Sequence, residues 1–194
     1  MTSQLSILNP TPNVLPGPKL LHELVATQSK GGVPAIEHTL HDGSKQAISY
    51  HELRLQSDRL ASQLRSIRSA STIANNERFI VPLYIEQCPD LYVAQLAILK
   101  AGGAFCPIAL DAPEDRIRFI LQDIEASILL TTSQLSKRLP VLDSVNVTCV
   151  DDDMSGAGHD NPSFPIDPSQ AAYIMCVACP RCEGLKLTIH DQVY

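Results

Sequence analysis

Short apolar runs alternate with longer amphipathic stretches along most of this chain. The apolar runs with the length of a buried strand are 78–85, 105–110, 127–132, 145–150 and 172–177. The stretches with helical spacing of apolar residues are 50–68, 89–100 and 113–124, and 134–139 predicts a short helical turn. Strands that alternate with helices pair in parallel and place the helices on the faces of the sheet. The pattern therefore predicts an α/β fold with a layered, mostly parallel sheet and flanking helices.

The N-terminal part of the chain has a different pattern. Residues 1–17 are polar and carry several prolines, which favours an extended lead-in. A helix is expected from Leu20, and two short runs at 33–40 and 45–49, split by a polar turn, predict a β-hairpin. The domain organisation we expect is the lead-in at 1–17 followed by one unit at 18–194.

A helix start is expected at Ser49. Its hydroxyl can accept a hydrogen bond from the backbone N–H of Glu52, while the Glu52 carboxylate reaches back to Ser49, as in a capping box. Ile48 and Leu53 stand at the two positions of a hydrophobic staple. The helix should bury one face and carry most of its charges elsewhere. The expected buried residues are Leu53, Leu60, Leu64 and Ile67, and the charged ones are Arg54, Asp58 and Arg65.

Composition and charge exclude several classes of protein. The net charge is −6 and no block of Lys and Arg occurs, so we expect no nucleic-acid partner. No apolar run approaches the ~18 residues that span a bilayer, and the N-terminus lacks the features of a secretory signal. We therefore expect no membrane partner and a cytoplasmic location, where the six cysteines would be free thiols.

Three segments carry motifs. ISYHEL at 48–53 is similar to the pattern L-[TS]-Y-x-E-L, LKAGGAFCP at 99–107 to L-K-A-G-x-A-Y-x-P, and PEDRI at 113–117 to P-x-E-R-[IL]. Together they resemble the adenylate-forming superfamily, specifically the adenylation domains of non-ribosomal peptide synthetases. The wording after Phe105 and the opening at 5–24 resemble fungal siderophore synthetases of the ferrichrome type.

The resemblance implies a fold, a reaction and partners. The fold is the first part of the large N-terminal subdomain of the adenylate-forming enzymes. The reaction uses ATP and Mg²⁺ to convert a carboxylate, here an amino acid, into an acyl-adenylate and pyrophosphate before thioester transfer. The partners are the remaining synthetase domains, namely the C-terminal adenylation subdomain and the carrier domain. Because the chain ends at Tyr194, we expect a truncated domain, in which Lys100 of the second motif is structural.

The family's third motif, which holds the ATP phosphates, is expected directly after Tyr173. Glycines there let backbone N–H groups approach the phosphates, and hydroxyls add donors. Here both are lost and a proline removes an N–H, although an arginine could pair with a phosphate. The degenerate ATP phosphate-loop positions are Cys176, Val177, Ala178, Cys179, Pro180, Arg181 and Cys182. We therefore expect no catalytic residue, no retained cofactor and a chain that is inactive alone.

Two other functions remain open. The chain could be a non-catalytic interaction module that docks with a synthetase or complements it. It could also be a small zinc-binding module, with Cys176, Cys179, Cys182 and His190 as ligands. We favour a decayed loop in which cysteines pack as small hydrophobes. The pair Cys179 and Cys182 has redox spacing but lacks the thioredoxin context.

Two further expectations concern surfaces. The acidic run 151–153 could chelate a cation, although a solvated loop is the favoured interpretation. Elements that come later in a complete domain normally cover its early helices and strands. We therefore expect the helix at 90–100 and the strand at 78–85 to expose apolar surface.

Overall fold

The computed structural model describes residues 20–27, 33–40, 42–70, 79–142, 144–152, 166 and 170–175. The helices are α1 (Leu21–Thr27), α2 (Tyr50–Ala70), α3 (Pro89–Lys100), α4 (Glu114–Asp123) and α5 (Ser133–Ser136). The strands are β1 (Pro34–Thr39), β2 (Lys45–Ser49), β3 (Ile80–Tyr84), β4 (Ala104–Pro107), β5 (Ile128–Thr131) and β6 (Asn146–Cys149). The expected lead-in at 1–17 lies outside the described residues.

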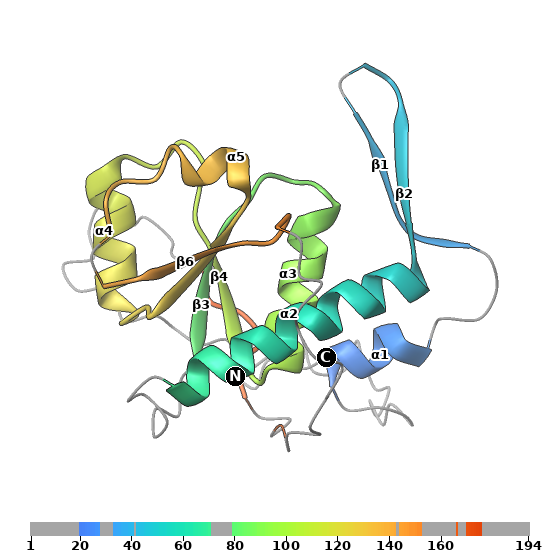
Figure 1. The fold of residues 1–194 in the computed structure, drawn as a ribbon, viewed down its shortest axis with the longest axis horizontal. Helices are drawn as coiled ribbons and strands as arrows, with labels where there is room; N and C mark the ends of the chain where they lie inside the picture. Colours follow the sequence, from blue (N-terminus) through green and yellow to red (C-terminus); the bar gives the residue numbers. More distant parts are fainter. Residues whose placement is uncertain are drawn as a thin grey trace, which may run out of the picture.

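The main sheet has the strand order β4-β3-β5-β6, and every pairing in it is parallel. Helices lie on both sides of these strands, with α2 and α3 on one side and α4 on the other (Figure 1). Side chains alternate between the two faces of each strand. In β5, Ile128 and Leu130 join the core under α2 and α3, while Leu129 joins the core under α4. The layered α/β prediction is confirmed.

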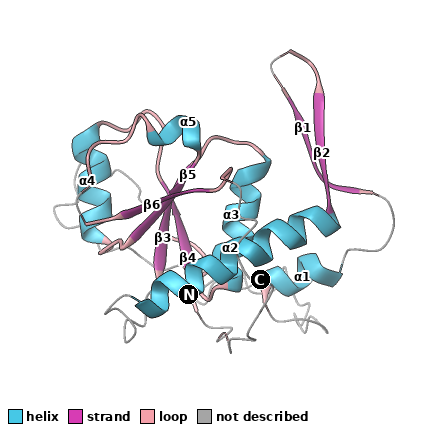
Figure 2. Ribbon diagram, in the orientation of Figure 1, coloured by secondary structure: helices cyan, strands magenta, loops and turns pink. Residues whose placement is uncertain are grey.

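The N-terminal hairpin forms a separate two-stranded sheet. Strands β1 and β2 pair antiparallel and project from the N-terminal end of α2, away from the main sheet (Figure 2). Gly43 has φ +83° in the turn, a left-handed conformation that glycine adopts without a steric penalty. The expected hairpin and the expected helix from Leu20 are both confirmed.

The predicted capping box is present at the start of α2. The Ser49 backbone N–H donates to Glu52 Oε2 at 2.9 Å, and the Glu52 N–H donates to Ser49 Oγ at 3.2 Å. The hydrogen bonds from the Ser49 backbone and hydroxyl lower the pKa of the Glu52 carboxyl. Ile48 and Leu53, the staple positions, are both buried in the same core.

Pro82 lies inside β3, although proline removes a donor from a strand. On the β4 side, the carbonyls of Phe79 and Leu83 accept hydrogen bonds from the N–H groups of Ala104 and Ile108. The ladder between β3 and β5 contains only Leu83 and Tyr84. Pro82 therefore precedes that ladder, and its missing N–H leaves no rung of it unpaired.

The expectation of exposed apolar surface on α3 and β3 is wrong. In β3, Val81, Leu83 and Tyr84 are almost fully buried, and six of the twelve residues of α3 are buried. Helix α2 covers α3, so the described part of the chain already closes this core. Tyr92 is the one large apolar side chain of α3 that is classed as exposed, at 40%. No helix among the described residues combines the length and the apolar character needed to cross a bilayer.

Candidate functional site

A short segment at 171–175 adds to the main sheet beside β4. The Phe105 N–H donates to the Ala172 carbonyl at 3.2 Å, and the Ile174 N–H donates to the Phe105 carbonyl at 2.9 Å. This pairing is parallel, and the rings of Phe105 and Tyr173 stack with centroids 5.9 Å apart. The strand expected at 172–177 is present as this single bridge, and its last two residues lie outside the described residues.

The direction of this segment decides where the following residues begin. Because it is parallel to β4, it ends at the carboxyl edge of the sheet, the edge where open α/β sheets bind ligands. Ile174 is buried, whereas Met175 is 64% exposed. The described segment thus ends with Met175 at the surface of that edge.

The predicted site residues themselves lie outside the described residues. They are the degenerate loop positions Cys176, Val177, Ala178, Cys179, Pro180, Arg181 and Cys182, together with the alternative zinc ligand His190. The expectations for a decayed phosphate loop, a zinc site and a redox pair therefore stay predictions from sequence.

A buried polar group joins α2 to the end of α3, and we call it the seam group: Ser57, Asp58, Arg65 and Lys100. Lys100 Nζ donates to Asp58 Oδ1 and to Ser57 Oγ, both at 2.8 Å. Arg65 Nη1 donates to the Lys100 carbonyl at 3.1 Å. The side chain of Lys100 is 13% exposed and that of Asp58 is 34% exposed.

The seam group explains the role of Lys100. Burial lowers the pKa of its ammonium, and the hydrogen bond and charge of Asp58 oppose that shift. These contacts tie one end of α3 to α2, as a structural lysine should. The expectation that Arg65 points elsewhere is wrong, because it is 9% exposed and bonds across the seam. Helical periodicity alone does not show that an arginine caps a neighbouring helix.

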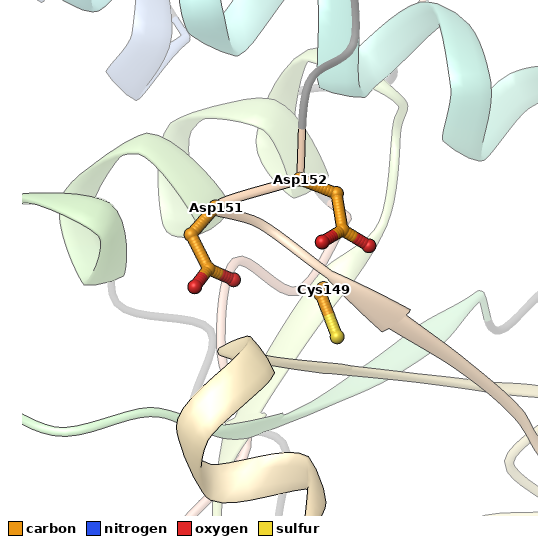
Figure 3. Close-up of side chains that lie close together, drawn as sticks. All are labelled: Cys149, Asp151 and Asp152. Atoms are coloured by element: carbon orange, nitrogen blue, oxygen red, sulfur yellow. The ribbon is translucent and has the colours of Figure 1, made fainter.

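A second polar group lies where β6 ends, and we call it the strand-end group: Cys149, Asp151 and Asp152. Their ligand atoms lie within 4.8 Å of one another, and Figure 3 shows the three side chains side by side. The Ser133 N–H donates to Asp151 Oδ1 at 2.8 Å, and Ser133 Oγ donates to Asp152 Oδ1 at 3.0 Å. The two carboxylates therefore already bind the start of α5.

The strand-end group is distant from the 171–175 segment in the sheet. That segment flanks β4, whereas β6 is the outer strand on the opposite side. The acidic run predicted at 151–153 contributes two members, and its third residue lies outside the described residues. Cys149 was not predicted as a member. Its position two residues before Asp151 at a strand end was the available signal.

A hollow of about 340 Å³ lies beside the strand-end group and is lined by Arg59 and Asp90 as well as by both aspartates. Burial, and secondarily the charge of Asp151, raises the pKa of the Asp90 carboxyl. Directly before α3, burial raises the pKa of the Cys88 thiol, which disfavours a reactive thiolate there.

Most of the chain matches a known protein family. Residues 25–176 match the family model described as AMP-binding enzyme. The matched range includes α2, α3 and the turn between α3 and β4, together with the 171–175 segment.

Two curated fungal proteins are among those that resemble this chain. It is 42% identical over 177 residues to the nonribosomal peptide synthetase SIDC of Beauveria bassiana, covering 88% of this chain and 3% of the relative. It is 33% identical over 155 residues to the siderophore peptide synthetase fer3 of Mycosarcoma maydis, covering 74% of this chain and 3% of the relative. The chain thus spans only a small part of the length of these relatives.

A solved structure has a similar fold. The AMPPNP-bound form of the nonribosomal peptide synthetase FmoA3 matches with a TM-score of 0.67 at 27% identity, over 86% of this chain and 17% of that one. The shared region is the layered α/β part described above.

Proposed function

Since this chain belongs to the AMP-binding enzyme family, we propose that it is the part of an adenylation domain that leads to the ATP phosphate loop. Its type is that of the non-ribosomal peptide and siderophore synthetases it resembles, whose family reaction activates an amino acid with ATP. One observation carries the proposal. The 171–175 segment runs parallel to β4 and ends with Met175 at the carboxyl edge of the sheet, directly before the loop positions in the sequence.

We also propose that this chain does not catalyse adenylation by itself. A phosphate loop needs glycines so that backbone N–H groups can approach the phosphate oxygens. At 176–182 both glycines are replaced by residues with side chains, which hinder the approach of the backbone N–H groups to a phosphate, and Pro180 offers no N–H. Arg181 supplies one cation, which can attract a phosphate but cannot replace several directed N–H groups.

Magnesium does not fit the strand-end group in this proposal. Asp151 and Asp152 accept hydrogen bonds from Ser133, and they lie beside β6 rather than beside the 171–175 segment. Met175, the last described residue before the loop, offers no hard oxygen ligand in its side chain. We therefore derive no step through a metal ion from these residues.

ATP–pyrophosphate exchange with a panel of amino acids tests the proposal of inactivity. The expected rate equals the background without protein, and exchange above background contradicts inactivity.

Calorimetric titration with ATP tests the position of the loop. A Cys176→Gly/Cys179→Gly variant should bind ATP more tightly than the parent chain, because two N–H groups become approachable. Cys149→Ala is the matched control and should bind like the parent, because Cys149 ends β6, the outer strand on the side of the sheet opposite β4.

A docking role is the second candidate function. Tyr173 and Met175 are 40% and 64% exposed on the outer segment of the sheet, where a further domain could cover them. The partner we propose is the remainder of a synthetase. Size-exclusion chromatography of the chain mixed with a recombinant C-terminal adenylation subdomain and carrier domain should show co-elution. Separate elution at micromolar concentrations of both proteins contradicts this role.

A further inference from the structure

The turn after α3 places one backbone carbonyl beside the 171–175 segment. The Gly102 N–H donates to Leu99 O and the Gly103 N–H donates to Ile98 O, with Gly102 at φ +69°. These two bonds form a Schellman motif, which ends the helix. The carbonyl of Gly102 accepts a hydrogen bond from Nε2 of Gln170, the residue before the segment, at 2.7 Å.

This hydrogen bond joins positions 68 residues apart, and it precedes the backbone pairing of the same two segments. Gln170 bonds at Gly102, and two residues later Ala172 O accepts from the Phe105 N–H at 3.2 Å. The Ile174 N–H then donates to the Phe105 carbonyl. The side-chain bond therefore holds the residue that precedes the segment beside the start of β4. The two backbone bonds follow further along the chain.

The register of this segment decides which side chains face the core. Ile174 is 2% exposed and packs with the core under α4, whereas Tyr173 is 40% exposed. A slip by one residue would exchange these faces, because side chains alternate along a strand. In the described part of the chain, the backbone pairing of the segment consists of the two bonds at Phe105. Two rungs specify a register weakly, so a third, side-chain contact matters.

The surroundings of the turn hold the Gly102 carbonyl in place. Arg68 Nη1 donates to the neighbouring Ala101 carbonyl at 3.4 Å and stacks over the Phe79 ring at 5.0 Å. Gly103 lies so close to Phe79 that a Cβ there would be 2.7 Å from the ring. The Gly102 carbonyl thus belongs to a tightly packed turn. The hydrogen bond from Gln170 fixes the segment relative to that turn.

We propose that Gln170 is a positioning residue, whose bond to the Gly102 carbonyl fixes the register of residues 171–175 on β4. It thereby sets where Met175, the last described residue of the segment, lies at the carboxyl edge of the sheet. The register claim stands on the contacts above. Its consequence for a nucleotide rests on the proposed function.

Amide hydrogen exchange measured by NMR on the full chain tests the register claim. Gln170→Met keeps the length and apolar stem of the side chain but removes the donor, and Gln170→Ala removes both. In each variant the Ile174 amide should exchange about tenfold faster, since one hydrogen bond is lost. Amides in the ladder of β3 and β5 should change less than about twofold. Gln122→Ala, on the exposed side of α4, is the matched control and should change neither.

Three outcomes overturn the inference. Unchanged exchange at Ile174 in both variants means that Gln170 does not position the segment. Equal acceleration at Ile174 and in β3 means that Gln170 supports only global stability. Faster exchange in Gln170→Ala but not in Gln170→Met assigns the effect to packing rather than to the hydrogen bond.

Because exchange requires no nucleotide, this test is separate from that of the proposed function. If Cys176→Gly/Cys179→Gly does not bind ATP more tightly than the parent chain while the exchange pattern is as expected, the proposed position of the phosphate loop is contradicted and the positioning role stands. In a chain given ATP affinity by Cys176→Gly/Cys179→Gly, Gln170→Met should weaken binding several-fold. Addition of Gln122→Ala to the same chain should leave the affinity unchanged.

Discussion

The seam group and the strand-end group are both clusters of ionisable side chains, yet they differ in what holds them. Lys100 is almost buried, and its neighbours Asp58 and Ser57 satisfy its charge across two helices. Asp151 and Asp152 are exposed and bond to Ser133 at the start of a four-residue helix. Burial makes each partner in the seam group matter, because little water can reach the group to replace a partner that is lost. In the strand-end group, water can replace any lost partner.

The difference between the two groups also shows that a sequence motif and a ligand site are separate things. The sequence LKAGGAFCP is the most specific motif of the chain. Its lysine bonds α3 to α2, and its glycines form the turn between α3 and β4. The acidic run looks more like a ligand set, but two of its side chains accept hydrogen bonds from Ser133 at the start of α5, whose N-cap is Thr132. A specific motif can therefore record a packing requirement, and a cluster of carboxylates can serve a local structural contact.

The largest expected effect is at the turn beside the seam. Gly103→Ala places a Cβ 2.7 Å from the Phe79 ring and 2.9 Å from its backbone oxygen, so the turn must shift. We expect the free energy of unfolding, measured by urea denaturation, to fall by about 3 kcal/mol. Gly43→Ala is the control, because nothing lies within 4 Å of its Cβ and only its positive φ is penalised. It should lose about 1 kcal/mol, and equal losses in both variants would contradict the packing argument.

The next largest effect separates the two polar groups directly. Asp58→Ala leaves the Lys100 ammonium without its carboxylate, and we expect a loss of about 2 kcal/mol, reduced from the fully buried case because Asp58 is partly exposed. Asp152→Ala removes an exposed acceptor and should cost about 0.5 kcal/mol or less. Chemical denaturation of both variants measures the difference. A cost for Asp152→Ala as large as that for Asp58→Ala would show that exposure does not distinguish the groups.

The capping box gives a smaller effect that depends on pH. Ser49→Ala should lower the free energy of unfolding by about 1 kcal/mol at neutral pH. Because hydrogen bonds lower the pKa of Glu52 in the folded state, its contribution is complete above its unfolded value of 4.5 and is lost as the pH falls through the lower folded value. The difference between the parent chain and Ser49→Ala should therefore shrink in acid. Thermal melts at pH 7 and below pH 4.5 measure it, and a constant difference contradicts the linkage.

The smallest expected effect is that of divalent cations. Millimolar Ca²⁺ or Mg²⁺ should leave the melting temperature unchanged, because Asp151 and Asp152 are exposed and already bonded to Ser133. Asp151→Asn is the control and should melt identically with and without the ions. A rise in melting temperature in the parent chain that Asp151→Asn abolishes would assign a cation site to the strand-end group.

Local patterns predicted most of the elements. The capping box at Ser49 and Glu52 forms as expected, and Ile117, Ile120 and Leu121 on α4 are buried as their spacing indicates. These features depend on residues within one or two turns of each other. The family resemblance carried by 48–53 and 99–107 is likewise a property of short segments, and the match over 25–176 agrees with it.

Contacts between distant segments were not predictable in the same way. Periodicity placed Arg65 away from the core, although its guanidinium bonds to the end of α3. It also left Cys149 out of the group that it joins with Asp151 and Asp152. The expected exposure of α3 and β3 was wrong, because the described elements cover those surfaces themselves.

The sequence by itself determined the order and type of the elements, the helix start at Ser49 and the family. Only the tertiary structure decided that Lys100 pairs with Asp58 and that Gln170 reaches Gly102. The physical reason is range. Helical and strand periodicity depends on neighbours along the chain, whereas a hydrogen bond between residues 68 positions apart depends on how packed helices and strands bring them together.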